Sequence, residues 1–115
     1  MTKLDFTSQF ALQDMIYLIM QEKNLSIKEA IKFAIKKELL FRIQETDWAE
    51  IAIQHWGHDN PERKWNSLRK PIIELEFSED ERKALDYLIK RYQIDLEMAL
   101  GYFLVFTMES LGYHI

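Results

Sequence analysis

The sequence predicts a mainly α-helical domain that contains two strand-helix-helix units in one chain. Three observations support this fold class. An alternating apolar run and two helical patterns follow one another in residues 71–106, a weaker version of the same order opens the chain, and the segment between them differs in composition. At 115 residues the chain has the length of one domain. The expected organisation is therefore unit one at about 1–43, a helical connection at 44–70 and unit two at 71–115.

The first unit is expected to begin with a short strand at residues 3–6, where Leu4 and Phe6 alternate with polar residues. A helix should follow, capped by Thr7 or Ser8 and ended by Asn24. Its apolar positions recur with helical spacing at Leu12, Met15, Ile16 and Ile19.

A second helix is predicted from Ser26 to about Ile43. Ser26 and Glu29 have the spacing of a capping box, in which each side chain bonds the backbone N–H of the other residue. The apolar face continues through Ile27, Ala30, Ile31, Ala34, Ile35 and Leu39.

The connection should contain two short helices. Asp47 and Glu50 have capping-box spacing for a helix that ends near Gly57, and Pro61 suits the first position of a turn of helix that runs to Leu68. All three tryptophans, Trp48, Trp56 and Trp65, lie in this connection. Because large rings stabilise most when buried, we expect the connection to pack on the rest of the molecule.

The second unit has stronger signals. Residues 73–77 alternate between apolar and acidic side chains, as a half-buried strand does. Ser78 with Glu81 predicts the next capping box, and Asp95 predicts the start of a last helix that runs to about Leu111. This helix is apolar nearly all round, so either the core or an oligomer interface through Leu96–Met108 is expected to cover it.

The two units correspond residue by residue over part of their length. The segment 17–19 (Tyr-Leu-Ile) matches 87–89, and after a one-residue gap 25–27 (Leu-Ser-Ile) matches 94–96 (Ile-Asp-Leu). The unit resembles the ribbon-helix-helix fold of small bacterial repressors and antitoxins. That resemblance implies a pseudo-dimer in which the strand near residues 3–6 pairs with the strand at 73–77 as an antiparallel ribbon.

The same resemblance places four side chains on the outer face of the ribbon: Lys3, Asp5, Glu74 and Glu76. In the family these positions enter the DNA major groove, where cationic and amide side chains read base edges. Three carboxylates would be repelled by the phosphates. The same acids also suit the solvated face of an exposed strand.

Charge along the chain favours a protein partner over DNA. Residues 71–115 carry 9 acidic and 4 basic side chains, whereas residues 1–45 carry 6 and 7. An acidic unit suits a basic protein surface better than a phosphate backbone. The candidate partner-binding residues are the four ribbon residues and the three tryptophans.

DNA binding stays open as an alternative through two groups of cations. Lys28, Lys32 and Lys36 lie four residues apart on one predicted helix, and Arg63, Lys64, Arg69 and Lys70 surround Trp65. Each group also suits an ordinary solvated surface, because acidic residues interrupt both.

No motif in the sequence indicates catalysis or a cofactor. The chain has no cysteine and no glycine-rich phosphate loop, and Ser8, Ser26 and Ser78 all have capping positions. His55 and His58, with Asp59 adjacent, have a spacing that could reach a metal from one helical turn, but nothing else supplies the remaining ligands and Gly57 is expected to break the helix between them. No apolar run is long enough for a membrane span, and the first residues lack a leader pattern, so a cytoplasmic location is expected. The expected function is that of a non-enzymatic regulatory or interaction protein, such as an inhibitor, antitoxin or immunity-like protein, with a DNA-binding regulator and a homodimeric structural subunit as alternatives.

Overall fold

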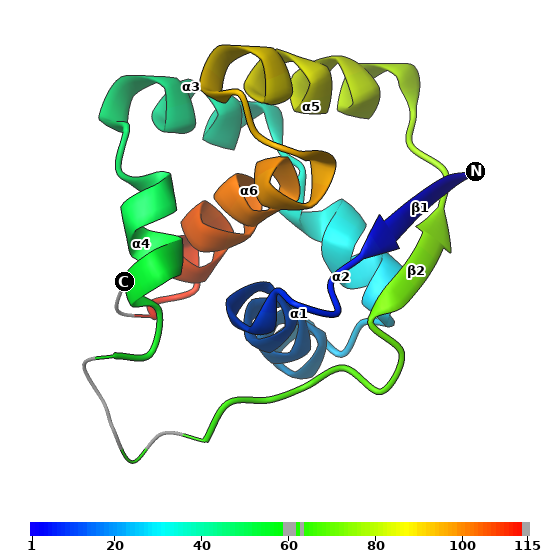
Figure 1. The fold of residues 1–115 in the computed structure, drawn as a ribbon, viewed down its shortest axis with the longest axis vertical. Coiled ribbons are helices and arrows are strands. Elements are labelled where there is room, and N and C mark those ends of the chain that lie inside the picture. Colours follow the sequence, from blue (N-terminus) through cyan, green and yellow to red (C-terminus); the bar gives the residue numbers. More distant parts are fainter. Residues whose placement is uncertain (59–61, 63, 114–115) are drawn as a thin grey trace.

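The computed structural model describes residues 1–58, 62 and 64–113 (Figure 1). In chain order the elements are β1 (Thr2–Asp5), α1 (Phe10–Lys23), α2 (Ile27–Ala34), α3 (Lys37–Thr46), α4 (Ala49–His55), β2 (Ile72–Leu75), α5 (Glu79–Tyr92) and α6 (Leu96–Ser110). The prediction of a mainly helical chain with a two-stranded antiparallel sheet is confirmed.

The ribbon joins the two strand segments that the sequence singled out. β1 and β2 pair antiparallel, with Leu4 opposite Ile73 and Lys3 opposite Glu74. Leu4, Ile73 and Leu75 are buried on the inner face, as the alternation predicted. Phe6, just beyond β1, is also buried, and its N–H donates to the carbonyl of Pro71.

Three of the predicted helix starts are confirmed by their caps. Ser26 and Ser78 form complete capping boxes with Glu29 and Glu81, and the Asp95 side chain accepts from the N–H of Met98. The predicted cap at Thr7 or Ser8 is wrong, because α1 begins after Gln9 without a side-chain cap. The Thr7 hydroxyl and N–H donate instead to Asp5.

The single helix predicted from Ser26 to about Ile43 is broken into α2 and α3. Ile35 and Lys36 adopt extended backbone angles between them. Neither is proline or glycine, so no local residue demands the break. The turn lets α3 pack on α6, with Leu39 and Ile43 buried, and this tertiary packing overrides the local helical pattern.

The connection departs furthest from its predicted structure. Asp47 is not the N-cap of α4, as its spacing predicted, but the C-cap of α3. Its φ of 49° lies in the left-handed region, which aspartate tolerates better than most residues. The predicted helix from Pro61 to Leu68 is absent from its described part, since residues 64–68 have no helical structure. Pro61 itself lies outside the described residues.

α6 is the centre of the core, as its all-round apolar sequence predicted. Figure 1 shows it crossing the middle of the molecule, and it contacts each of α1 to α5. Every residue from Ala99 to Met108 is buried within the one chain. The core therefore covers this helix, and a homo-oligomer would need a different surface.

Two buried polar side chains on α1 hold the connection in place. Gln13 donates to the carbonyl of Phe6 at 2.6 Å and accepts from the N–H of Leu68 at 3.0 Å. Its neighbour Asp14 is fully buried and accepts from the indole N–H of Trp56 at 2.6 Å and from the N–H and side-chain amide of Asn66. Because buried polar groups are costly when unpaired, these bonds fix the path of the irregular segment.

Candidate interaction surface on the ribbon

The outer face of the ribbon carries charged residues around one apolar residue. Lys3 lies opposite Glu74, and Asp5 lies opposite Ile72. All four of these side chains are exposed, and Ile72 is 49% exposed. Glu76 is exposed one residue beyond the end of β2. We call these five residues the ribbon face.

Asp5 holds its negative charge at one end of the ribbon face. Its carboxylate accepts from the hydroxyl of Thr7 at 2.5 Å and from the Thr7 N–H at 3.0 Å. These two hydrogen bonds keep the pKa of Asp5 below its usual value. Asp5 is therefore ionised at neutral pH and is held in a fixed geometry.

A further carboxylate borders the ribbon at this end. The N–H of Asp5 donates to Glu97, in the first turn of α6, at 3.0 Å. At the other end the guanidinium of Arg82 donates to the Thr2 hydroxyl at 3.2 Å. The face itself has three carboxylates and one ammonium, so it retains the acidic character that the sequence predicted.

The three tryptophans do not form one surface with the ribbon face. Trp56, one of the candidate partner-binding residues, is 1% exposed and bonded to Asp14, so it is a core residue of the folded chain. Trp48 is half-buried, with its ring 4.6 Å from that of Phe106. Trp65 is 39% exposed and packs beside Gly57, which leaves it the most accessible of the three.

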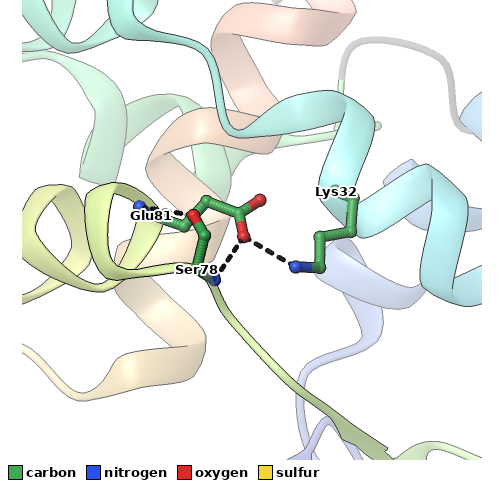
Figure 2. A network of polar contacts seen from close by, with 3 residues as sticks. All are labelled: Lys32, Ser78 and Glu81. Atoms are coloured by element: carbon green, nitrogen blue, oxygen red, sulfur yellow. Dashed lines mark hydrogen bonds and ion pairs between the residues drawn. The ribbon is translucent and has the colours of Figure 1, made fainter.

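Two lysines of the proposed DNA-binding group make contacts within the molecule. In Figure 2 the ammonium of Lys32 points toward the carboxylate of Glu81. The Lys32 Nζ lies 2.6 Å from Glu81 Oε1, an oxygen that also accepts from the N–H of Ser78. The Nζ of Lys36 lies 3.9 Å from the centroid of the Phe33 ring, a cation–π geometry. Lys28 is exposed on α2. Of the three lysines on α2 and at its end, only Lys28 therefore forms neither an ion pair nor a cation–π contact with another described residue.

The second cationic group lies on the irregular part of the connection. Lys64, Arg69 and Lys70 are exposed, and Arg63 lies outside the described residues. Trp65 is the only aromatic residue of this segment, so the described part has no stacking platform for successive bases.

Ile72 is the ribbon-face residue that the sequence reading omitted. The alternation that assigns Ile73 and Leu75 to the inner face also assigns Ile72 to the outer one, so the signal was available. An exposed isoleucine among carboxylates is more typical of a protein contact than of a surface that reads base edges.

Comparisons with models of protein families, with curated proteins and with solved structures found no match to this chain. In the described ranges 1–58, 62 and 64–113, no helix has the length and hydropathy needed to cross a bilayer. The rings of His55 and His58 lie 6.0 Å apart, and no group of three potential metal ligands is found among the residues of those ranges.

Proposed function

We propose that the protein is a tandem ribbon-helix-helix-like pseudo-dimer that acts as a non-enzymatic interaction module, and that its ribbon face binds a basic surface of another protein. The observation that carries this proposal is the ribbon face itself. It sits where the family that the sequence resembles contacts DNA, but it presents Asp5, Glu74 and Glu76 around the exposed side chain of Ile72.

The pseudo-dimer is supported by one constant spacing between the two units. α1 and α5 each have 14 residues, and both ends are 69 positions apart, Phe10 to Glu79 and Lys23 to Tyr92. The one-residue gap in the sequence alignment is then unnecessary. At this spacing buried residues correspond in the pairs Leu4 and Ile73, Ile16 and Leu85, Ile19 and Leu88, Ala30 and Ala99, and Ile31 and Leu100.

The turns and caps follow the same spacing. Asn24 and Gln93 are both left-handed residues that end the first helix of each unit, with φ 53° in each case. Ser26 and Asp95 then cap the second helices. On the ribbon, Leu4 pairs with Ile73, its own counterpart, as a residue on the two-fold axis of an antiparallel ribbon must.

The charge of the ribbon face supports a protein rather than DNA as its partner. Most of the affinity for DNA comes from cations that neutralise phosphates, and only Lys3 is available on this face. A basic protein surface gains from the same carboxylates through steering and complementarity, and Ile72 adds apolar contact area.

The test is affinity capture from extracts of cells that make the protein naturally. The wild-type chain, the double variant E74K/E76K and the control E22K/E45K are used as baits; the control changes the net charge equally through exposed glutamates of α1 and α3. A protein recovered by the wild type and the control but lost with E74K/E76K supports the proposal. Equal recovery by all three baits would exclude the ribbon face as the contact.

A gel-shift titration tests the DNA-binding alternative. A duplex complex that weakens steeply between low and moderate salt would indicate a regulator that binds phosphates, and it would be expected to depend on Lys28 or on the 64–70 segment. The interaction module is expected to leave duplex DNA unshifted at both salt concentrations. Light scattering on the same samples separates a monomer from a homodimeric subunit.

A further inference from the structure

A polar pocket lies on another part of the molecule, between the connection and unit two. It has a volume of about 380 Å³. Asp47, Ala49 and Glu50 line it from the segment around the start of α4, and Arg91 and Tyr92 line it from the end of α5. Ile43 of α3 and Tyr102 of α6 complete the lining. The proposed contact with the ribbon face does not involve any of these residues.

The hydroxyl of Tyr102 is the most informative group in this pocket. The residue is 3% exposed, yet no other described residue forms a hydrogen bond with its hydroxyl. The hydroxyl oxygen is not among the fully buried, unpaired polar atoms of the described residues, so it reaches the surface of the pocket. A tyrosine that lines a pocket with an unused hydroxyl can therefore offer that group to a ligand.

The neighbouring tyrosine shows the usual, satisfied arrangement. The Tyr92 hydroxyl donates its one proton to the carbonyl oxygen of Ile43 at 3.1 Å and to Oδ1 of Asp47 at 3.2 Å, which share it. The two tyrosine rings meet edge to face, with centroids 5.1 Å apart. Tyr92 is thereby held in place as one wall of the pocket.

The electrostatics of the pocket favour a cation. Burial raises the pKa of Tyr102 to about 12, with further contributions from the negative charges of Glu50 and Asp47. Glu50 is exposed and forms no hydrogen bond or ion pair with any other described residue. Arg91 supplies one positive charge, with its guanidinium 5.5 Å from the Tyr92 ring centroid, so the lining keeps a net negative charge.

We infer that this pocket binds a small organic cation, a primary ammonium or a guanidinium group. The carboxylates of Glu50 and Asp47 accept its N–H donors, and the oxygen of Tyr102 accepts another. Such a group has two sources, a free small amine or guanidine and the lysine or arginine side chain of a protein.

NMR titration of the full chain tests the site through the ring resonances of Tyr92 and Tyr102. The probes are butylammonium, butylguanidinium, the uncharged isostere butanol and a blocked pentapeptide with a central arginine. We expect saturable shifts with the cations at millimolar concentration and none with butanol. Tighter binding of the peptide would identify a protein side chain as the source, and equal binding a free small molecule.

Four variants make the assignment specific. We expect E50Q to weaken binding about tenfold, because it removes a negative charge opposite the cation, and Y102F to weaken it about threefold, because it removes the hydroxyl that accepts from the cation. R91Q should have the opposite effect and tighten binding, since it removes the competing positive charge. E45Q changes an exposed glutamate of α3 outside the pocket and should leave binding unchanged.

Circular dichroism establishes that each variant is folded before it is titrated. No saturable shift with any cation, or shifts that E50Q and Y102F leave as strong as in the wild type, would overturn the inference. The result is independent of the ribbon-face captures, because E74K/E76K leaves every residue of this pocket in place.

Discussion

The indole N–H of Trp56 donates to Oδ2 of Asp14 at 2.6 Å, and neither side chain is accessible to solvent beyond 1%. This bond joins the connection to the first helix of unit one. It also explains why an irregular segment can have a defined path, because the same carboxylate accepts from the N–H of Asn66. Two residues that are far apart in sequence thus hold the middle of the chain in place.

Removing this bond should destabilise the protein. We expect W56F to lower the free energy of unfolding by about 2 kcal/mol, because the buried carboxyl group of Asp14 loses one hydrogen bond and the smaller ring leaves space in the core. Denaturant unfolding measures the change. The control W65F alters a ring that is 39% exposed and should cost under about 1 kcal/mol. An equal decrease in the free energy of unfolding in W56F and W65F would contradict the conclusion that the hydrogen bond from Trp56 to Asp14 stabilises the fold.

The caps provide a comparison between serines. S26A and S78A should each cost about 1 kcal/mol, because each removes the side-chain acceptor for the N–H of Glu29 or Glu81. S8A should have almost no effect, since Ser8 is exposed and does not cap α1. Thermal and denaturant unfolding of the three variants would show this order, and a loss in S8A as large as in S26A would contradict it.

Gly101 allows a close approach between helices in the core. A Cβ at this position would lie 2.7 Å from Cδ2 of Leu12 and 3.1 Å from Cδ1 of Ile53. We expect G101A to cost roughly 1 to 3 kcal/mol through overpacking, although alanine is the better helix former. The double variant G101A/L12A should cost less than the two single changes added together. Strict additivity would mean that Leu12 is not the residue that meets the new methyl group.

The ion pair between the units predicts a dependence of stability on pH. Burial alone raises the pKa of Glu81, but the hydrogen bonds from Lys32 and Ser78 outweigh it and place the pKa below its usual 4.5. Because the folded pKa is lowered, the stabilisation is complete above about pH 4.5 and is lost as the pH falls through the folded value. The free energy of unfolding of the wild type should therefore decrease on acidification below this point.

E81Q isolates the contribution of this carboxylate. Glutamine can still serve the capping box, so the variant removes mainly the charge opposite Lys32. Unfolding measured from pH 6 to pH 3 should show a shallower loss in E81Q than in the wild type. E79Q, a change in an exposed glutamate of the same helix turn, is the control. An unchanged slope in E81Q would rule out Glu81 as a source of the acid sensitivity.

Local signals in the sequence were sufficient for three of the N-caps, for the strands and for the central helix, but not for the cap predicted at Thr7 or Ser8. Ser26, Ser78 and Asp95 act within one helical turn, and the alternation around Ile73 depends only on its neighbours, so each can be read from a short window. The buried state of α6 follows from its apolar circumference. The strand signals are enough to predict which residues form the ribbon face. The same alternation of inner and outer residues also assigns Ile72 to that face.

The prediction of one helix over residues 26–43 and of an N-cap at Asp47 failed because tertiary contacts decide the structure at these positions. The break at Ile35 and Lys36 has no local cause and depends on the packing of α3 against α6. Asp47 has the sequence spacing of a cap, but its carboxylate accepts from Tyr92, on a helix far along the chain. The pocket at Tyr102 likewise unites three segments, and no single stretch of sequence contains its pattern.

The pairing of β1 with β2 also constrains the order of folding. The helical hairpin of α5 and α6 closes over a short turn, whereas the ribbon joins segments from widely separated parts of the chain, and such long-range contacts form slowly. The acidic face therefore comes into existence only when both halves of the polypeptide have met. A partner that recognises it would distinguish completed molecules from nascent or half-assembled ones.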